Sequence, residues 1–208
     1  MGYYIRVLGE KSNPISPSQI QQWLLDEGFV NIVVIAASGD DENWQQVLVK
    51  RKRGKELFTI ERNIVAANSL GFEEIQEFVD EIESAKPVSA AKWLKGYLPK
   101  VKVIYAFQIL FGNGKSDDWK ILHTLQGKIW KTVGGILQAD NEGFSNKNGY
   151  HILWQFSDHA KGMWNMAVRN IFGGWNKFQM DLGNLEHRKA FQEGKVPKRV
   201  KPVGRVGQ

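Results

Sequence analysis

The fold is indicated first by residues 3–38, which read YYIRVLGEKSNPISPSQIQQWLLDEGFVNIVVIAAS. The first seven residues of this stretch are rich in aromatic and β-branched side chains, as is typical of a strand. Ser16 is a suitable helix N-cap, and Pro17 suits the first helical position. Gln19 follows Ser16 by three residues and so stands at the N3 position of a capping box. Gly28 ends the helix, and the apolar run after it predicts a buried strand. The stretch is therefore a β-α-β unit.

Two further strands and a helical segment extend this unit. Residues 44–51 alternate between two faces, and residues 57–65 form the next predicted strand after a turn. The following segment carries an acidic helix with an apolar stripe and a second, shorter helix. We therefore predict a β-α-β-β-β module over residues 1–67 and a helical connector over residues 68–99.

The same order of elements returns in residues 100–193. A strongly apolar strand precedes a helix capped at Ser116 or Asp117, and further strands and a short helix follow. Two of these strands are expected over residues 136–144 and 150–156. The sequence thus predicts an α+β fold with two β-α-β-β-β type modules. Either the modules are a pseudo-duplication, or their likeness is a coincidence among common α+β orders.

The C-terminal stretch, residues 194–208, is rich in proline, glycine and basic side chains and predicts a disordered tail. The alternative to separate modules is one compact domain over residues 1–193. The net charge of +6 comes from this tail and from one hairpin. The candidate binding residues for an anionic partner are Lys50, Arg51, Lys52, Arg53 and Lys55 of the hairpin, and Lys198, Arg199 and Lys201 of the tail.

The composition excludes several classes of protein. The chain has no cysteine, which excludes disulfide frameworks, thiolate metal sites and cysteine nucleophiles. Its first ten residues lack a signal-peptide pattern, and no apolar run reaches the roughly 20 residues of a membrane helix. We therefore expect a cytoplasmic protein with no membrane partner. The usual phosphate-loop, dinucleotide-binding, nucleophile-elbow and zinc-protease motifs are also absent.

The paired β-α-β-β-β order resembles the vicinal oxygen chelate (glyoxalase-like) architecture. In that architecture two such units curl into half-barrels around a metal or another ligand. The resemblance is one of topology, and it implies a central ligand site. Metal enzymes of that family draw His and Glu ligands from both modules. All four histidines here lie in the second half, which puts such a metal site in doubt: His123, His151, His159 and His187.

The densest group of polar side chains suggests a catalytic site. Asp140 and Glu142 would project from one face of the strand predicted over residues 136–144. Strand pairing could bring His151 close to either carboxylate. Carboxylates and imidazoles serve acid–base catalysis or a divalent metal site. The alternative is a solvated hairpin in which the same residues serve a turn.

Three hypotheses of function stay open. The first is a non-enzymatic binding or interaction protein, with a protein or a small molecule as partner. The second is a small enzyme that uses Asp140, Glu142 and His151. The third is a nucleic-acid-binding protein that uses the basic hairpin and tail. Of the eight tryptophans, Trp44 and Trp175 are among those not clearly on an apolar stripe, so they could line a pocket or an interface. The sequence identifies no cofactor, metal or oligomeric state.

Overall fold

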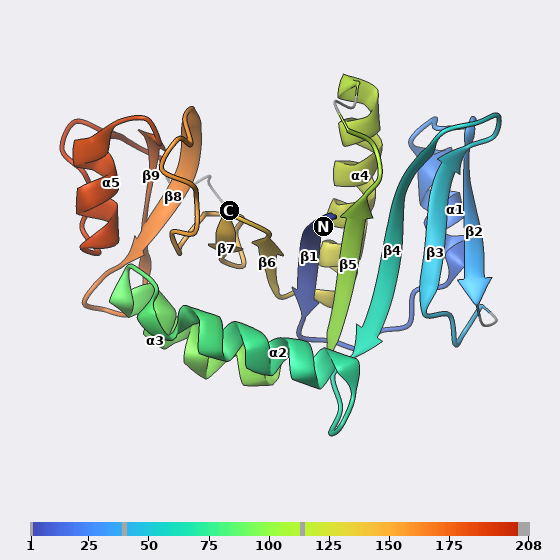
Figure 1. Cartoon of the computed structure of the whole chain (residues 1–208), viewed down its shortest axis with the longest axis horizontal. Helices are drawn as coiled ribbons and strands as arrows, with labels where there is room; N and C mark the ends of the chain where they lie inside the picture. Colours follow the sequence, from blue (N-terminus) through green and yellow to red (C-terminus); the bar gives the residue numbers. More distant parts are fainter. Residues whose placement is uncertain (1, 39–40, 113–114, 204–208) are drawn as a thin grey trace. The chain divides into compact units, whose positions relative to one another are not determined.

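The computed structural model describes residues 2–38, 41–112 and 115–203 (Figure 1). Its α+β fold divides into two compact units. Unit 1 comprises Met1–Glu73 and Val101–Gly135, and unit 2 comprises Glu74–Lys100 and Ile136–Gln208. These boundaries differ from those of the modules expected from the sequence, because the chain leaves unit 1 and later returns to it.

Unit 1 is built on an antiparallel sheet with the strand order β2-β3-β4-β5-β1. Its strands are β1 (Tyr3–Gly9), β2 (Ile32–Ser38), β3 (Gln46–Arg51), β4 (Glu56–Ile64) and β5 (Val103–Ile109). Tyr105 of β5 pairs with Val7 on one side and with Arg62 on the other. The strand that was expected to open a second module therefore completes the first sheet. The predicted internal duplication is not shown.

Two helices cover one face of this sheet, α1 (Pro17–Asp26) and α4 (Ser116–Val133) (Figure 1). Ser16 caps α1 as predicted, since its side chain accepts a 3.1 Å hydrogen bond from the backbone N–H of Gln19. Alternate strand residues on the covered face, such as Ile60 and Phe107, are fully buried. The opposite face carries mostly polar, half-buried side chains such as Arg6 and Gln108. The core of unit 1 therefore lies between the sheet and these two helices.

Unit 2 combines helices with two small groups of strands. Helix α2 (Leu70–Glu81) crosses from unit 1 into unit 2. Its other elements are the 3-10 turns η1 (Ile82–Ser84) and η2 (Leu98–Lys100), α3 (Val88–Tyr97), the hairpin of β6 (Ile136–Ala139) and β7 (Gly143–Ser145), the strands β8 (Met163–Arg169), β9 (Trp175–Asp181) and β10 (Lys201–Pro202), and α5 (Leu185–Gln192).

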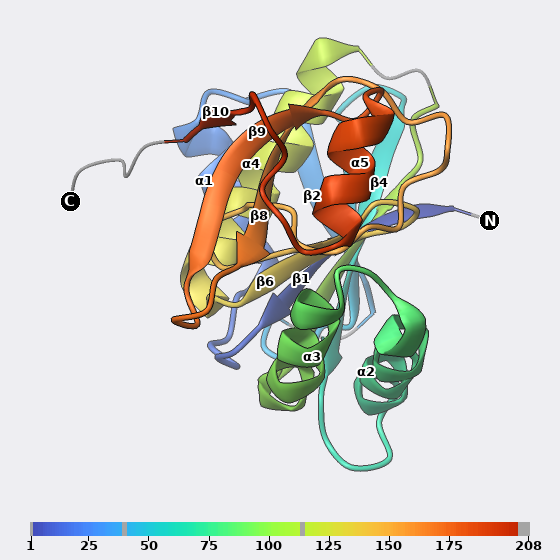
Figure 2. The same cartoon turned by 90° about the vertical axis from the view of Figure 1, so that its left-hand side faces the viewer.

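The core of unit 2 forms where α5 packs against one face of the β8–β9 ribbon (Figure 2). Met166, Phe178 and Met180 project from this face of the ribbon, and Phe191 reaches it from α5. All four are buried. Because strand side chains alternate, the residues between them face the other way.

Two strand predictions in unit 2 are wrong. The strand expected over residues 136–144 is interrupted by a turn, in which Asn141 and then Gly143 take positive φ values of 59° and 113°. The strand expected over residues 150–156 is reduced to isolated bridges, at His151 and at Trp154. Between β6 and β7 the local turn geometry outweighs the strand-forming character of the side chains.

The prediction of a disordered tail is wrong for Lys201 and Pro202. These residues form β10, which pairs with Gln179 and Phe178 of β9. The next residue, Val203, also donates a backbone hydrogen bond to Lys177 at 3.2 Å. Proline is tolerated here because β10 is an edge strand. Residues 204–208 lie outside the described part of the chain.

Candidate functional site

His151 is buried and packed rather than placed in a polar cleft. Its side chain lies against the rings of Phe156 and Trp164, with ring centroids 4.7 and 5.7 Å away. Its Nε2 donates a 2.8 Å hydrogen bond to the backbone carbonyl of Glu142. Burial lowers the pKa of His151 to about 4, although its hydrogen bonds with the backbone of Glu142 and Leu153 act in the opposite direction. The imidazole is therefore neutral at pH 7.

The two carboxylates of the predicted catalytic group do not share a strand face. Asp140 and Glu142 both lie in the turn between β6 and β7. His151 contacts this turn through the Glu142 backbone, as described above. Among the described residues, no group of three His, Asp or Glu side chains is arranged to hold a metal ion. The catalytic role of these residues remains a prediction from the sequence alone.

The basic hairpin between β3 and β4 is partly neutralised within unit 1. Arg51 and Lys55 lie 2.6 and 3.3 Å from the carboxylate oxygens of Asp118, which is buried in the first turn of α4. Asp118 therefore neutralises part of the positive charge of the hairpin from within unit 1. The side chains of Lys52 and Arg53 are exposed.

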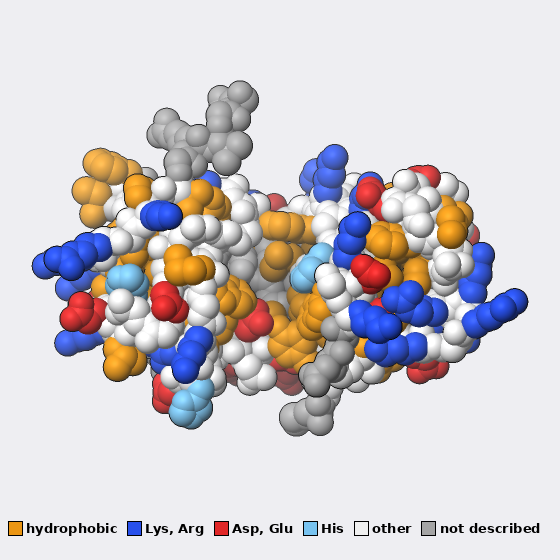
Figure 3. Space-filling view, turned by 90° about the horizontal axis from the view of Figure 1, so that it is seen from above, with side chains coloured by type: hydrophobic (Ala, Val, Ile, Leu, Met, Phe, Trp, Pro, Cys, Tyr) orange, Lys and Arg blue, Asp and Glu red, His pale blue; other side chains and the backbone are white. Residues whose placement is uncertain are grey.

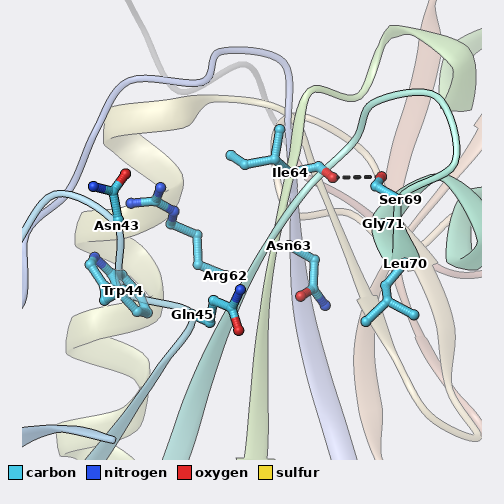
Figure 4. Close-up of a pocket in the computed structure, with 9 residues that line it drawn as sticks. All are labelled: Asn43, Trp44, Gln45, Arg62, Asn63, Ile64, Ser69, Leu70 and Gly71. Atoms are coloured by element: carbon cyan, nitrogen blue, oxygen red, sulfur yellow. Dashed lines mark hydrogen bonds between the residues drawn. The ribbon is translucent and has the colours of Figure 1, made fainter. Parts of the chain in front are cut away.

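A first pocket lies in unit 1, where the ends of β3 and β4 meet the start of α2 (Figure 4). Its volume is about 470 Å³. The guanidinium of Arg62 lies 5.5 Å from the centre of the buried Trp44 ring and donates a 3.1 Å hydrogen bond to the Glu42 carbonyl. Ser69 Oγ, on another wall, donates to the Ile64 carbonyl at 2.8 Å. Several polar atoms of this pocket are thus already hydrogen-bonded to other groups of the protein.

Unit 2 carries a surface on which aromatic rings alternate with cations. We name it the Trp175 surface, and it comprises Trp93, Lys147, Tyr150, Arg169, Trp175 and Lys177, together with Tyr97, whose side chain is buried. The Trp93 ring stacks on Tyr97 at 4.8 Å and meets Trp175 edge-on at 5.2 Å. The guanidinium of Arg169 lies 5.0 Å from the centre of the Trp175 ring. Two more such pairs follow: Lys147 with Tyr97 at 5.3 Å, and Lys177 with Tyr150 at 4.9 Å.

The register of the β8–β9 ribbon explains why these side chains share a face. Arg169 is paired directly with Trp175, and Ala167 is paired with Lys177. Directly paired residues project to the same side of a sheet. The core residues Met166 and Phe178 project to the other side. The ribbon therefore presents Arg169, Trp175 and Lys177 away from the core, where α3 supplies Trp93 and Tyr97.

A pocket of about 600 Å³ in unit 2 adjoins this surface through Arg169. We name it the Arg169 pocket. Its lining includes three cations, Arg169, Lys86 and Lys189, together with Glu193. A hydrogen bond from Lys195 and its charge, together with the charges of Lys189 and Lys86, lower the pKa of Glu193. The pocket is thus dominated by positive charge.

The segments that build the Trp175 surface contain no acidic residue. Residues 84–100, 143–157 and 159–180 lack Asp and Glu entirely, although each contains at least one lysine. Figure 3 shows another side of unit 2 (left), seen from above, where hydrophobic side chains lie among those of Lys, Arg, Asp and Glu. Cations next to half-exposed aromatic rings, with no acid in the same segments, favour an anionic partner that also carries flat apolar groups.

Only part of this site could be recognised in the sequence. Trp175 was recognised as a residue that could line an interface, but Trp93, which is half-exposed, was not. The absence of acid from residues 159–180 was a usable signal. The sequence carries no signal for the contact between the Trp93 and Trp175 rings, because this contact depends on how α3 packs against β8.

Comparisons of the chain with protein-family models, curated proteins and solved structures give no match. The described residues contain no helix that is both long and apolar enough to cross a membrane.

Proposed function

We propose that this protein is a non-enzymatic binding protein whose partner is single-stranded nucleic acid, held on the Trp175 surface of unit 2. One observation carries the proposal. Arg169 lies over the Trp175 ring and also lines the Arg169 pocket. Groups suited to bases and groups suited to phosphates therefore meet at one side chain.

The aromatic members of the surface supply stacking positions. Trp93, Tyr150 and Trp175 are half-exposed, so part of each ring is accessible to a partner. Bases of single strands stack on such rings without strong sequence preference, and arginine adds a cation–π contribution. The pairing of Arg169 with Trp175 holds both groups in place before binding, which lowers the entropy lost when a strand docks.

The cations supply the contacts with the phosphate backbone. Lys86, Lys189 and Arg169 converge on the Arg169 pocket, and Lys177 lies two residues beyond Trp175 on the same strand face. Neutralised phosphates release counterions, so affinity that arises this way falls steeply as the salt concentration rises. The neutral, buried His151 is poorly suited to acid–base chemistry at pH 7, which favours a binding role over the enzymatic hypothesis.

The test is fluorescence anisotropy with labelled dT and rU 15-mers. We expect Arg169→Ala and Trp175→Ala to weaken binding about tenfold each, as one lost stacking or charge contact does. Trp175→Phe keeps an aromatic ring and should retain most of the affinity. Lys86→Ala should reduce the slope of log affinity against log salt concentration by about one, which corresponds to one released counterion. Circular dichroism of each variant checks that it is folded.

Lys52→Ala and Arg53→Ala are the matched controls, since they remove the same charge from exposed positions in unit 1. Each should change the affinity less than Arg169→Ala does. A larger effect from the hairpin variants would place the nucleic acid on the hairpin, as the sequence alone suggested. No binding of either 15-mer at low salt would contradict the proposal altogether.

A further inference from the structure

The turn between β8 and β9 exposes two large apolar side chains next to the Trp175 surface. Ile171 is 94% exposed and Phe172 is 91% exposed, more than any other large hydrophobic residue in the described part of the chain. Leaving such residues in water is unfavourable. Two neighbouring apolar side chains at the end of a hairpin are therefore candidates for contact with a partner.

Hydrogen bonds to the side chain and backbone of Asn170 hold the turn in a defined shape. Asn170 Oδ1 accepts hydrogen bonds from the backbone N–H of Phe172 at 3.0 Å and of Gly174 at 2.9 Å. The backbone N–H of Asn170 also donates to the Gly174 carbonyl at 3.0 Å. Gly173 has a φ of 81°, which favours glycine. Ile171 and Phe172 are thus presented by an ordered turn.

The position of the turn indicates what it contacts. It directly continues the paired residues Arg169 and Trp175, which are the last residues of β8 and the first of β9. A strand held on these two residues brings its neighbouring bases to the turn. Residues 159–180 contain no acid that would repel the phosphates of a nucleic acid.

We propose that Ile171 and Phe172 act as a wedge at the junction between single-stranded and double-stranded nucleic acid. Phe172 stacks on the last base pair and Ile171 fills the space beside it, while the single strand runs over the Trp175 surface. Proteins that kink a duplex insert apolar side chains of this kind between base steps and partly unstack them. The inference rests on the proposed function and adds a substrate class, the fork between single and double strands.

The test uses a forked DNA duplex with 2-aminopurine at the first paired position, because the fluorescence of this base rises when it is unstacked. We expect a rise when the wild-type protein binds the fork. The double variant Ile171→Ser with Phe172→Ser should lose this rise and still bind the dT 15-mer within about threefold of wild type. Phe172→Trp should keep the rise. Leu185→Ser is the matched control, because Leu185 is also a highly exposed apolar residue of unit 2.

Each outcome separates the wedge from the binding surface. Wild-type protein that binds the 15-mer without a rise at the fork overturns the wedge and leaves the proposed function intact. A rise that persists in the double variant does the same. Failure to bind the 15-mer overturns both. Binding to anionic lipid vesicles that is lost in the double variant would assign the turn to a membrane surface and overturn the wedge.

Discussion

Arg51 donates a hydrogen bond of 2.6 Å to the carboxylate of Asp118, which is 1% exposed. Lys55 lies 3.3 Å from the second oxygen. Burial by itself raises the pKa of Asp118, but the hydrogen bonds and charges of Arg51 and Lys55 outweigh it and lower that pKa. This group ties the β3–β4 hairpin to α4.

We predict that Asp118→Asn lowers the free energy of unfolding by about 2–3 kcal/mol, because it weakens charge-assisted hydrogen bonds at a buried position. Because the folded-state pKa is lowered, the stabilisation is present above the ordinary carboxyl pKa of 3.8 and is lost as the pH falls through the lower folded value. Urea unfolding measures both effects. Asp117→Asn, at an exposed position in the same helical turn, should cost only about 0.5 kcal/mol.

His151 should make the stability of the protein depend on pH. Its pKa of about 4 in the folded state lies below the ordinary histidine value of 6.5. The unfolded chain therefore binds a proton at a higher pH than the folded chain does. Neutral His151 contributes fully to the free energy of unfolding above pH 6.5. Between pH 6.5 and 4 this contribution falls by up to about 1.4 kcal/mol for each pH unit.

The variant His151→Gln tests this assignment, because glutamine can donate to the Glu142 carbonyl but does not titrate in this range. The loss of unfolding free energy between pH 7 and pH 5 should be smaller in His151→Gln than in the wild type. His159→Gln is the control, since His159 is exposed, and it should keep the wild-type dependence. An NMR titration that gives His151 a pKa near 6.5 would contradict the assignment.

The elements that the sequence predicted well are those specified by neighbouring residues. The cap at Ser16 fixed the start of α1, and the strand over Tyr3–Gly9 has the predicted bounds. The errors arose where pairing between distant segments decides the outcome. Residues 101–111 looked like the start of a new module, yet β5 pairs with β4 and β1. Pairing of that kind depends on the completed sheet and leaves little trace in local pattern.

In the candidate site, too, the sequence showed the local features but not the contacts between distant segments. The basic side chains of residues 50–55 were evident from the sequence, but the ion pairs of Arg51 and Lys55 with Asp118 were not. The Trp175 surface could not be predicted as a whole, because α3 and the β8–β9 ribbon contribute its parts from separate segments. Only the orientation of Arg169 and Trp175 could have been inferred, from the alternation of side chains along a hairpin.

Trp44 should contribute strongly to the stability of unit 1. Its Nε1 donates a 2.6 Å hydrogen bond to the Ile15 carbonyl, and Ile15 is fully buried. Trp44→Phe removes the donor and leaves this carbonyl unsatisfied, which should cost about 1–3 kcal/mol in urea unfolding. Trp23→Phe is the control, because Trp23 is half-exposed on α1, and it should cost less. Equal losses in the two variants would contradict a special role for the Trp44 hydrogen bond.

Two glycines of unit 1 should respond to alanine in opposite directions. Gly135 has a φ of 95°, and a Cβ placed there would overlap the backbone carbonyl of Leu8. Gly135→Ala should therefore lower the free energy of unfolding by about 3 kcal/mol or more, since both the dihedral angle and the overlap are unfavourable. Gly127 lies within α4, and a Cβ there would meet no atom within 4 Å apart from the neighbouring backbone of its own helix.

Gly127→Ala should raise the free energy of unfolding by about 0.5–1 kcal/mol, because alanine loses less backbone entropy in a helix than glycine does. The two variants add the same methyl group, so their difference isolates the surroundings of each glycine. Thermal unfolding followed by circular dichroism gives both values. A Gly135→Ala protein as stable as the wild type would mean that the backbone of Gly135 does not lie against the Leu8 carbonyl.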